Sequence, residues 1–242
     1  MRISRIYIQQ PINAGSSLTL TDQAAHYLGK VLRLTPQTPI TLFNSDGFEY
    51  SGIITALAKK HVEVNILEQI SVNTESSLKT ILGLGISRGE RMDYAIQKST
   101  ELGISEIVPL FTEHGEVKLK GDRIEKRQAH WQQVAVSACE QSGRVVVPTV
   151  HRPRPLKEWI KTLECAEKLI FDASQAQSLS SEAPNGNVAL LIGPEGGFSN
   201  KEISEARESG FAGIKLGPRI LRTETAPVSV LSVLQYLWGD FN

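Results

Sequence analysis

Two short glycine-containing loops, 193–198 and 217–226, hold the side chains of this sequence that are best suited to chemistry. The first loop reads GPEGGF, and the second reads GPRILRTETA, which sets two arginines, two threonines and a glutamate close together. Each loop follows a predicted strand, and ligands bind at the carboxyl ends of strands in open α/β sheets because free backbone amides converge there. Glycine also lets a ligand approach the backbone closely. We therefore expect one ligand site that both loops build.

The residue types in these loops disfavour a phosphate ligand. GPEGGF lacks the GK[ST] ending of a phosphate-binding loop, and Pro194 has no amide hydrogen to donate. The stretch 83–89, GLGISRG, begins like a dinucleotide fingerprint, but Arg88 stands where the third glycine is needed. A phosphate-free ligand held by backbone groups and an apolar wall fits better, and S-adenosylmethionine is such a ligand. The alternative is that both loops are plain turns.

Composition excludes several other classes of protein. The chain has 242 residues, so we expect one large or two modest domains. Its net charge is zero, so any surface that binds nucleic acid must be a local cluster of positive charge. Cys139 and Cys165 form no CxxC motif, and the histidines lack metal-ligand spacing, so we expect no metal. The N-terminus has no signal-peptide pattern, and no apolar window is long enough to span a membrane. These features favour a soluble, cytoplasmic protein.

The pattern of the chain changes near residue 72. Residues 1–72 are rich in alternating strand patterns, with a hairpin signal at Asp46-Gly47 and one helix predicted over 22–33. A polar, serine-rich linker follows. Residues 73–242 alternate between strands and helices, which is typical of a parallel sheet with helices on both faces. Ser199 and Glu202 have the spacing of a capping box at the start of one such helix.

Five motifs together resemble one known family. They are HYLGKVLRL (26–34), SRGERMDYAIQKSTELGI (87–104), ACEQSGR (138–144), LIGPEGGFS (191–199) and LGPRILRTETA (216–226). They are similar to the motifs of the ribosomal RNA small subunit methyltransferase E family, in the SPOUT class, and they run in order along nearly the whole chain. The resemblance implies a PUA-like RNA-binding β-barrel over 1–72 and a SPOUT methyltransferase domain with a C-terminal trefoil knot over 73–242. It also implies a homodimer that uses S-adenosylmethionine to methylate N3 of a uridine in 16S rRNA.

The resemblance also implies site residues. The methyl donor is expected to contact Phe171, Ile192, Gly193, Pro194, Glu195, Gly196, Gly197, Leu216, Gly217, Ile220, Leu221, Arg222, Thr223, Thr225 and Ala226. Arg222 and Glu224 are the expected catalytic residues. The Arg222 guanidinium suits a developing uridine anion because it stays charged and offers forked donors. Glu224 is expected to orient Arg222 or to relay the N3 proton. The alternative is that Glu224 only interacts with the positive end of the dipole of the last helix.

Local clusters of positive charge suggest where RNA binds. The expected RNA contacts are Arg2, Arg5, Lys30, Arg33, Arg88, Arg91 and Arg144, and the segments 117–130 and 144–157 are also rich in lysine and arginine. The alternative for any one cluster is a solvated face. Two other functions stay open from the residues alone: a SPOUT ribose 2′-O methyltransferase acting on tRNA, and a non-catalytic RNA-binding assembly factor.

Overall fold

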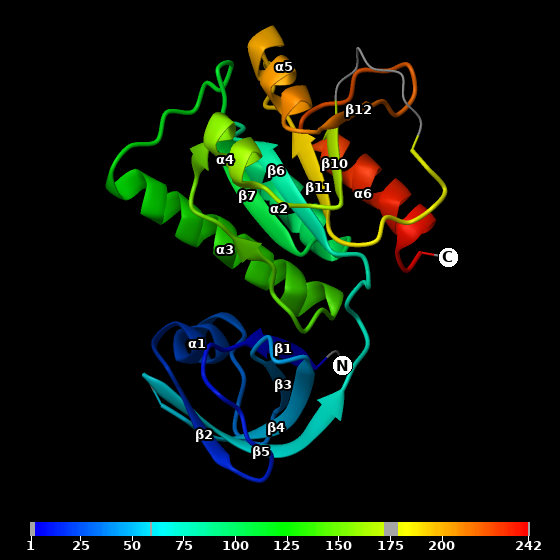
Figure 1. Ribbon diagram of the computed structural model, residues 1–242. Helices are drawn as coiled ribbons and strands as arrows, with labels where there is room; N and C mark the ends of the chain where they lie inside the picture. Colours follow the sequence, from blue (N-terminus) through cyan, green and yellow to red (C-terminus); the bar gives the residue numbers. More distant parts are fainter. Residues whose placement is uncertain (1–2, 59, 172–178, 242) are drawn as a thin grey trace. The chain divides into compact units, whose positions relative to one another are not determined.

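The chain folds into two compact units in the computed structural model, which describes residues 3–58, 60–171 and 179–241 (Figure 1). The first unit comprises Met1–Glu75 and Cys139–Val147, and the second comprises Ser76–Ala138 and Pro148–Asn242. The sequence places a boundary between residues 72 and 73, but nothing in it indicates that the nine residues from Cys139 to Val147 belong with the N-terminal part.

The first unit is built on a five-stranded sheet of order β1-β3-β4-β5-β2. Its strands are β1 (Ser4–Tyr7), β2 (Ser17–Thr21), β3 (Pro39–Phe43), β4 (Phe48–Leu57) and β5 (His61–Ser71). Only β1 and β3 pair in parallel; the other pairs are antiparallel. Gly47 supplies the positive φ, 94°, that the hairpin between β3 and β4 needs. The alternating buried residues of these strands pack with Leu28 into one core.

The helix predicted over 22–33 is divided in the structure. It forms a short α1 (Asp22–His26) and then a single π-helical turn, η1 (Tyr27–Val31). Arg33 follows with a positive φ of 52°. A π-helical turn is rare, and it leaves Lys30 and Arg33 exposed beside the core leucine of this segment.

The second unit is a parallel sheet of seven strands, of order β12-β10-β11-β6-β7-β8, with β9 also pairing with β7. The strands are β6 (Thr80–Gly85), β7 (Glu106–Phe111), β8 (Thr149–Val150), β9 (Arg154–Pro155), β10 (Glu167–Phe171), β11 (Val188–Ile192) and β12 (Ala212–Ile214). Every residue of β11 is buried, as expected for a parallel strand covered on both faces.

Five helices cover this sheet on both faces, as the alternation of strands and helices predicts (Figure 1). They are α2 (Glu90–Glu101), α3 (Asp122–Ser142), α4 (Leu156–Thr162), α5 (Asn200–Glu208) and α6 (Thr225–Trp238). On one face of the sheet, α4 and α5 pack together over Trp159 and Phe211. The helices α2 and α6 pack against each other. The capping box predicted at Ser199 and Glu202 is present at the start of α5. Within the described ranges, none of the helices combines the length and the apolar character that crossing a bilayer demands.

Candidate functional site

A cavity of about 550 Å³ opens at the carboxyl edge of the sheet in the second unit. Phe171 ends β10 and Ile192 ends β11, and both line this cavity. The rest of the lining comes mainly from the two loops that the sequence singles out, 193–198 and 217–226, and from Lys215 and Leu216 just before the second loop. The structure therefore brings both loops together around one space.

Twelve of the fifteen predicted donor-binding residues line the cavity: Phe171, Ile192, Gly193, Pro194, Glu195, Gly197, Leu216, Ile220, Leu221, Arg222, Thr223 and Ala226. The other three, Gly196, Gly217 and Thr225, belong to the same loops but do not line it. Glu224, predicted to be catalytic, also lines the cavity, as do Arg91, Phe198, Ile203, Lys215 and Arg219. Phe198 ends the loop 193–198 but was not named as a contact. Ile203 and Lys215 were not assigned to the site, because an apolar residue of a capped helix and a lysine after a strand carry no specific signal.

Gly196 packs closely against His114. A β-carbon built at Gly196 would lie 2.9 Å from the Cβ of His114, which is closer than real side chains approach. The His114 Nδ1 lies 3.1 Å from the Gly196 carbonyl oxygen, within hydrogen-bonding distance. Gly196 therefore lets the loop 193–198 pack against the segment after β7.

A chain of buried hydroxyl groups joins the two loops to the end of β6. The Thr223 hydroxyl donates to the Gly193 carbonyl at 2.9 Å, and the Ser87 Oγ lies 3.1 Å from the Thr223 Oγ1. The Ser87 hydroxyl also donates to the Gly85 carbonyl, at 3.3 Å. Ser87 is 4% exposed and Thr223 is 7% exposed, so both hydroxyl groups are shielded from water. Breaking one of these hydrogen bonds would therefore leave a buried polar group unsatisfied. Ser87 begins the motif 87–104, but the sequence assigned it no role at the site.

An ion pair fixes the loop 193–198 to the start of α2. The Glu195 carboxylate accepts from the Arg91 guanidinium at 2.9 Å and from the Arg88 backbone amide at 3.1 Å. Burial alone would raise the pKa of Glu195, but hydrogen bonds from backbone amides, that of Arg88 among them, and from Arg91 hold it below its usual value. In turn, the hydrogen bond to Glu195 raises the pKa of Arg91. Glu195 therefore stays ionised and keeps its loop in place.

Glu224 is the acidic group at the cavity with an unused acceptor. Its Oε2 is buried and has no hydrogen-bond partner among the described residues. Arg222, two residues earlier, also lines the cavity and is exposed. A buried carboxylate oxygen without a partner is costly in a folded protein, so it is a sign that a ligand supplies the missing donor.

Two of the predicted RNA-binding arginines of the first unit, Arg5 and Arg144, are engaged in its interior. Arg5 donates to the backbone carbonyls of Cys139, Glu140 and Arg144 and pairs with Glu49 at 2.7 Å. Arg144 pairs with Glu75 at 2.6 Å. Both guanidinium groups are largely buried, so we do not carry either residue into the proposed RNA surface.

The other predicted RNA contacts differ in their surroundings. Lys30 and Arg33 are exposed and have no ion-pair partner among the described residues. Arg88 pairs with Glu116, and Arg91 with Glu195, beside the cavity. Arg2 lies outside the described residues.

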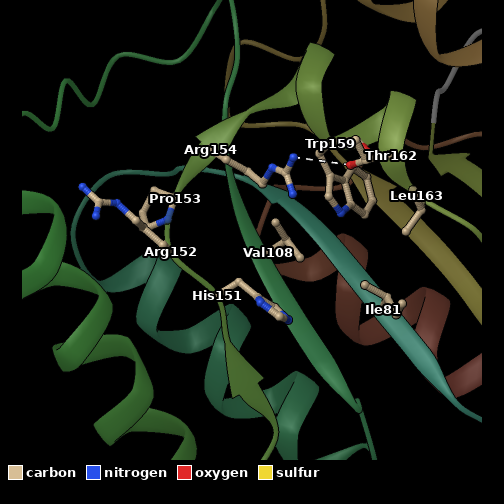
Figure 2. Close-up of a pocket in the computed structure, with 9 residues that line it drawn as sticks. All are labelled: Ile81, Val108, His151, Arg152, Pro153, Arg154, Trp159, Thr162 and Leu163. Atoms are coloured by element: carbon tan, nitrogen blue, oxygen red, sulfur yellow. Dashed lines mark hydrogen bonds between the residues drawn. The ribbon is translucent and has the colours of Figure 1, made fainter.

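A second cavity, of about 390 Å³, lies over β6 and β7, where Ile81 and Val108 line it (Figure 2). The polar side chains around it already have partners: His151 with Glu106 at 2.7 Å, Arg152 with Glu125 at 2.8 Å, and Arg154 with Thr162 at 3.4 Å. No residue that lines it is among the described residues with a buried, unsatisfied polar atom, so we assign it no ligand. Across the described chain, no three His, Cys, Asp or Glu residues gather as metal ligands would.

Comparison with known proteins agrees with this arrangement. Residues 74–235 match the model of an RNA methyltransferase domain, and residues 20–67 match that of an RNA methyltransferase PUA domain. The fold and the site thus define an RNA methyltransferase with an N-terminal PUA domain. Since the chain is also 37% identical, over 99% of the relative's length, to the ribosomal RNA small subunit methyltransferase E of Buchnera aphidicola (subspecies Schizaphis graminum), it belongs to the ribosomal RNA small subunit methyltransferase E family.

Solved structures extend this result. A ribosomal RNA small subunit methyltransferase E from Neisseria gonorrhoeae, bound to S-adenosyl methionine, is 38% identical with a TM-score of 0.93, and the match covers 100% of both chains. A Legionella pneumophila protein in complex with bound SAM is 40% identical with a TM-score of 0.95, again over 100% of both chains. The predicted fold class, a SPOUT-type parallel sheet with an N-terminal PUA-like domain, is confirmed. The trefoil knot and the closed barrel stay predictions.

Proposed function

We propose that this protein transfers a methyl group from S-adenosylmethionine to N3 of a uridine in the 16S rRNA of the small ribosomal subunit. The observation that carries the proposal is the cavity at the carboxyl edge of the sheet, which both Arg222 and Glu224 line, together with the Glu224 Oε2 that has no partner among the described residues. The structures from Neisseria gonorrhoeae and Legionella pneumophila, which hold this donor, support the cofactor.

The cavity fits the methyl donor in size and chemistry. Its volume, about 550 Å³, lies in the usual range for small-molecule sites. Phe171, Ile192, Leu216, Ile220 and Leu221 form an apolar lining that suits an adenine ring. The glycines of the loop 193–198 expose backbone groups for polar contacts. When bound, the donor supplies a methyl group carried on a positively charged sulfur.

Arg222 and Glu224 then act on the uridine. The N3 atom carries a proton and attacks poorly until that proton leaves. We assign Glu224 to accept this proton on its free carboxylate oxygen, because no other described group uses that atom. Arg222 donates hydrogen bonds to a uracil carbonyl oxygen and stabilises the negative charge that develops there. Positioning supplies much of the remaining rate, since methyl transfer is an in-line displacement.

We also propose that the protein is a homodimer. On α6, Tyr236 is 62% exposed, and on the neighbouring α2, Tyr94 is 47% exposed. Val228 and Val233 of α6 are only half-buried. Two adjacent helices with partly uncovered apolar and aromatic side chains suit burial against a second copy of the chain. Because its substrate is ribosomal RNA, we place the protein in the cytoplasm.

The decisive experiment maps the methyl group. Methylation of N3 removes the Watson–Crick edge of uridine, so reverse transcriptase should stop at the modified position in small-subunit RNA. Particles from cells lacking the protein should show no stop, and purified protein with S-adenosylmethionine should restore it. Mass spectrometry of the digested RNA should then place the methyl group on the base.

Three outcomes would contradict the proposal. A methyl group on ribose would overturn the N3 mechanism, because ribose methylation leaves base pairing intact. Transfer to tRNA rather than rRNA would overturn the substrate. Failure to bind S-adenosylmethionine in calorimetry would favour a non-catalytic RNA-binding protein.

A further inference from the structure

Five cations crowd the loop that joins β7 to α3 and the first turns of α3. They are Lys118, Lys120, Arg123, Lys126 and Arg127, against two acids in the same ten residues. All five side chains are exposed, and none forms an ion pair with another described residue. We call residues 118–127 the cationic segment. It lies in the second unit, and Figure 1 shows its loop as the long green connection before α3.

The apolar residues of the loop part of the cationic segment line a cavity. Val117 and Leu119 are half-buried and line an apolar cavity of about 310 Å³ with Ile86 and Leu110. Lys118 and Lys120 alternate with them and are exposed. Both lysines also line this cavity.

The helical part adds three cations on one face. Arg123, Lys126 and Arg127 are spaced i, i+3 and i+4, so they are neighbours on the surface of α3. Glu125 points elsewhere, because its carboxylate pairs with Arg152 at 2.8 Å. The amino end of α3, a helix of 21 residues, adds the positive end of its dipole.

The cationic segment lies close to the catalytic cavity along the chain. Four residues before Lys118, His114 contacts Gly196 of the loop that lines the cavity. Glu116, which lies between His114 and Lys118 in the sequence, pairs with Arg88, two residues before α2 begins. An extended chain of four residues spans at most about 14 Å. A polyanion with one base in the cavity therefore brings its neighbouring phosphates within reach of these cations.

We propose that the cationic segment is the surface that binds the RNA backbone beside the target nucleotide. Charge complementarity carries this assignment, since five exposed cations stand together in a chain whose net charge is zero. Lys118 and Lys120 contact phosphates along the loop, and the cations of α3 extend the contact. The inference rests on the proposed function and adds to it the place where the substrate lies.

The test neutralises the loop lysines and measures binding to purified, protein-free 16S rRNA over a series of salt concentrations. The double variant Lys118→Gln/Lys120→Gln should lower the log–log salt slope by up to about two units, one for each lost phosphate contact. The KM for this RNA should rise by about tenfold or more, while kcat and the affinity for S-adenosylmethionine stay near the parent values. Unchanged donor affinity also shows that the variant is folded. The variant Arg123→Gln/Lys126→Gln/Arg127→Gln should act in the same direction.

The matched control is Lys157→Gln/Lys161→Gln on α4, which removes the same charge elsewhere in the second unit. It should keep the parent salt slope and KM. A loop variant with the parent slope and KM would overturn the inference, and so would an equal loss in both double variants, since that is an effect of net charge alone. A defect seen only with assembled subunits, and not with protein-free RNA, would point to a ribosomal protein and also overturn it. If the parent methylates no small-subunit RNA, the proposed function fails, while the salt slope still decides this inference.

Discussion

At the scale of single residues, Glu224 is the side chain on which the proposed proton transfer depends. Its buried Oε2 has no described partner, so the folded protein carries the cost of an unsatisfied acceptor. Such a cost is typical of a group kept ready for a substrate. Arg222 stands two residues away with a complementary role.

We predict that Glu224→Gln will lower kcat by about 100-fold or more, because the amide keeps the size of the side chain but cannot take up a proton. The affinity for S-adenosylmethionine should change much less. Single-turnover methylation of small-subunit RNA, together with calorimetry of donor binding, measures both quantities. Glu164→Gln, at an exposed position away from the cavity, is the control. A Glu224→Gln protein with parent turnover would remove Glu224 from the chemistry.

Ser87 is a second residue whose role can be tested, although it does not line the cavity. Its hydroxyl shares a hydrogen bond with that of Thr223, which lies between Arg222 and Glu224 in the sequence and donates to the Gly193 carbonyl. We predict that Ser87→Ala will lower kcat by about tenfold. The loss leaves the buried Thr223 hydroxyl without this hydrogen bond, and an unsatisfied buried polar group costs about 1–3 kcal/mol.

The matched control for Ser87 is Ser99→Ala. Ser99 is fully buried in the same unit, but its hydroxyl has no partner among the described residues. Its loss should leave kcat unchanged. Thr223→Ser keeps the hydroxyl and should retain most of the activity, whereas Thr223→Val should resemble Ser87→Ala. Equal losses in Ser87→Ala and Ser99→Ala would reduce Ser87 to a packing residue.

At the scale of elements, the loop 193–198 is kept in place by the ion pair between Glu195 and Arg91. Hydrogen bonds hold the pKa of Glu195 below its usual value against the effect of burial, so the pair stabilises the folded loop when Glu195 is ionised. This contribution is fully present above the ordinary glutamate pKa of 4.5, and it is lost as the pH falls through the lower pKa of the folded protein.

We therefore predict that Glu195→Gln will weaken binding of S-adenosylmethionine at neutral pH. The difference from the parent should shrink as the pH falls below about 4.5 and the parent carboxylate takes up a proton. Calorimetry across this pH range gives the result. Glu205→Gln is the control, since Lys157 also lowers the pKa of Glu205, on α5, and Glu205 does not line the cavity. A Glu195 variant that binds the donor as the parent does at neutral pH would contradict a positioning role for this pair.

Much of the second unit could be predicted from local patterns, and the exceptions have physical causes. The apolar run of β11 and the capping box at Ser199 each depend on residues close in sequence, so they were visible. The two loops were assigned to one site because parallel strands end at a common edge. The contact of Gly196 with His114 and the bond of Ser87 to Thr223 join residues 82 and 136 positions apart, and no single-sequence pattern reports such pairs.

The first unit shows the same limit more clearly. Its hairpin at Gly47 was predicted, but the π-helical turn after α1 was not, because helical periodicity does not distinguish the two kinds of turn. Arg5 and Arg144 looked like surface cations. They are internal because the carbonyls at the end of α3 and the Glu75 carboxylate lie next to them, and charge counting along a sequence cannot reveal this.

At the scale of the whole molecule, the proposed homodimer makes a simple prediction. The chain has a mass of 26.6 kDa, so light scattering should report about twice that mass at micromolar concentration. Tyr94→Glu/Tyr236→Glu places charges on the exposed aromatic positions of α2 and α6, and it should shift the protein toward the monomer. A monomeric parent protein, or a charged variant that stays dimeric, would contradict the proposed interface.

The discontinuous first unit has a consequence for inheritance. It includes nine residues, from Cys139 to Val147, that lie far from Glu75 along the chain. Those residues supply the carbonyl acceptors of Arg5, and their Arg144 pairs with Glu75, whose carboxylate also accepts from the amides of Val145 and Val146. A gene fusion that moved only the first 75 codons would remove the carbonyl acceptors of Arg5, which would keep only Glu49, and would take from Glu75 its partners Arg144, Val145 and Val146. A single recombination event therefore cannot transfer the complete PUA-like unit to another protein. We expect the two units to have been inherited together.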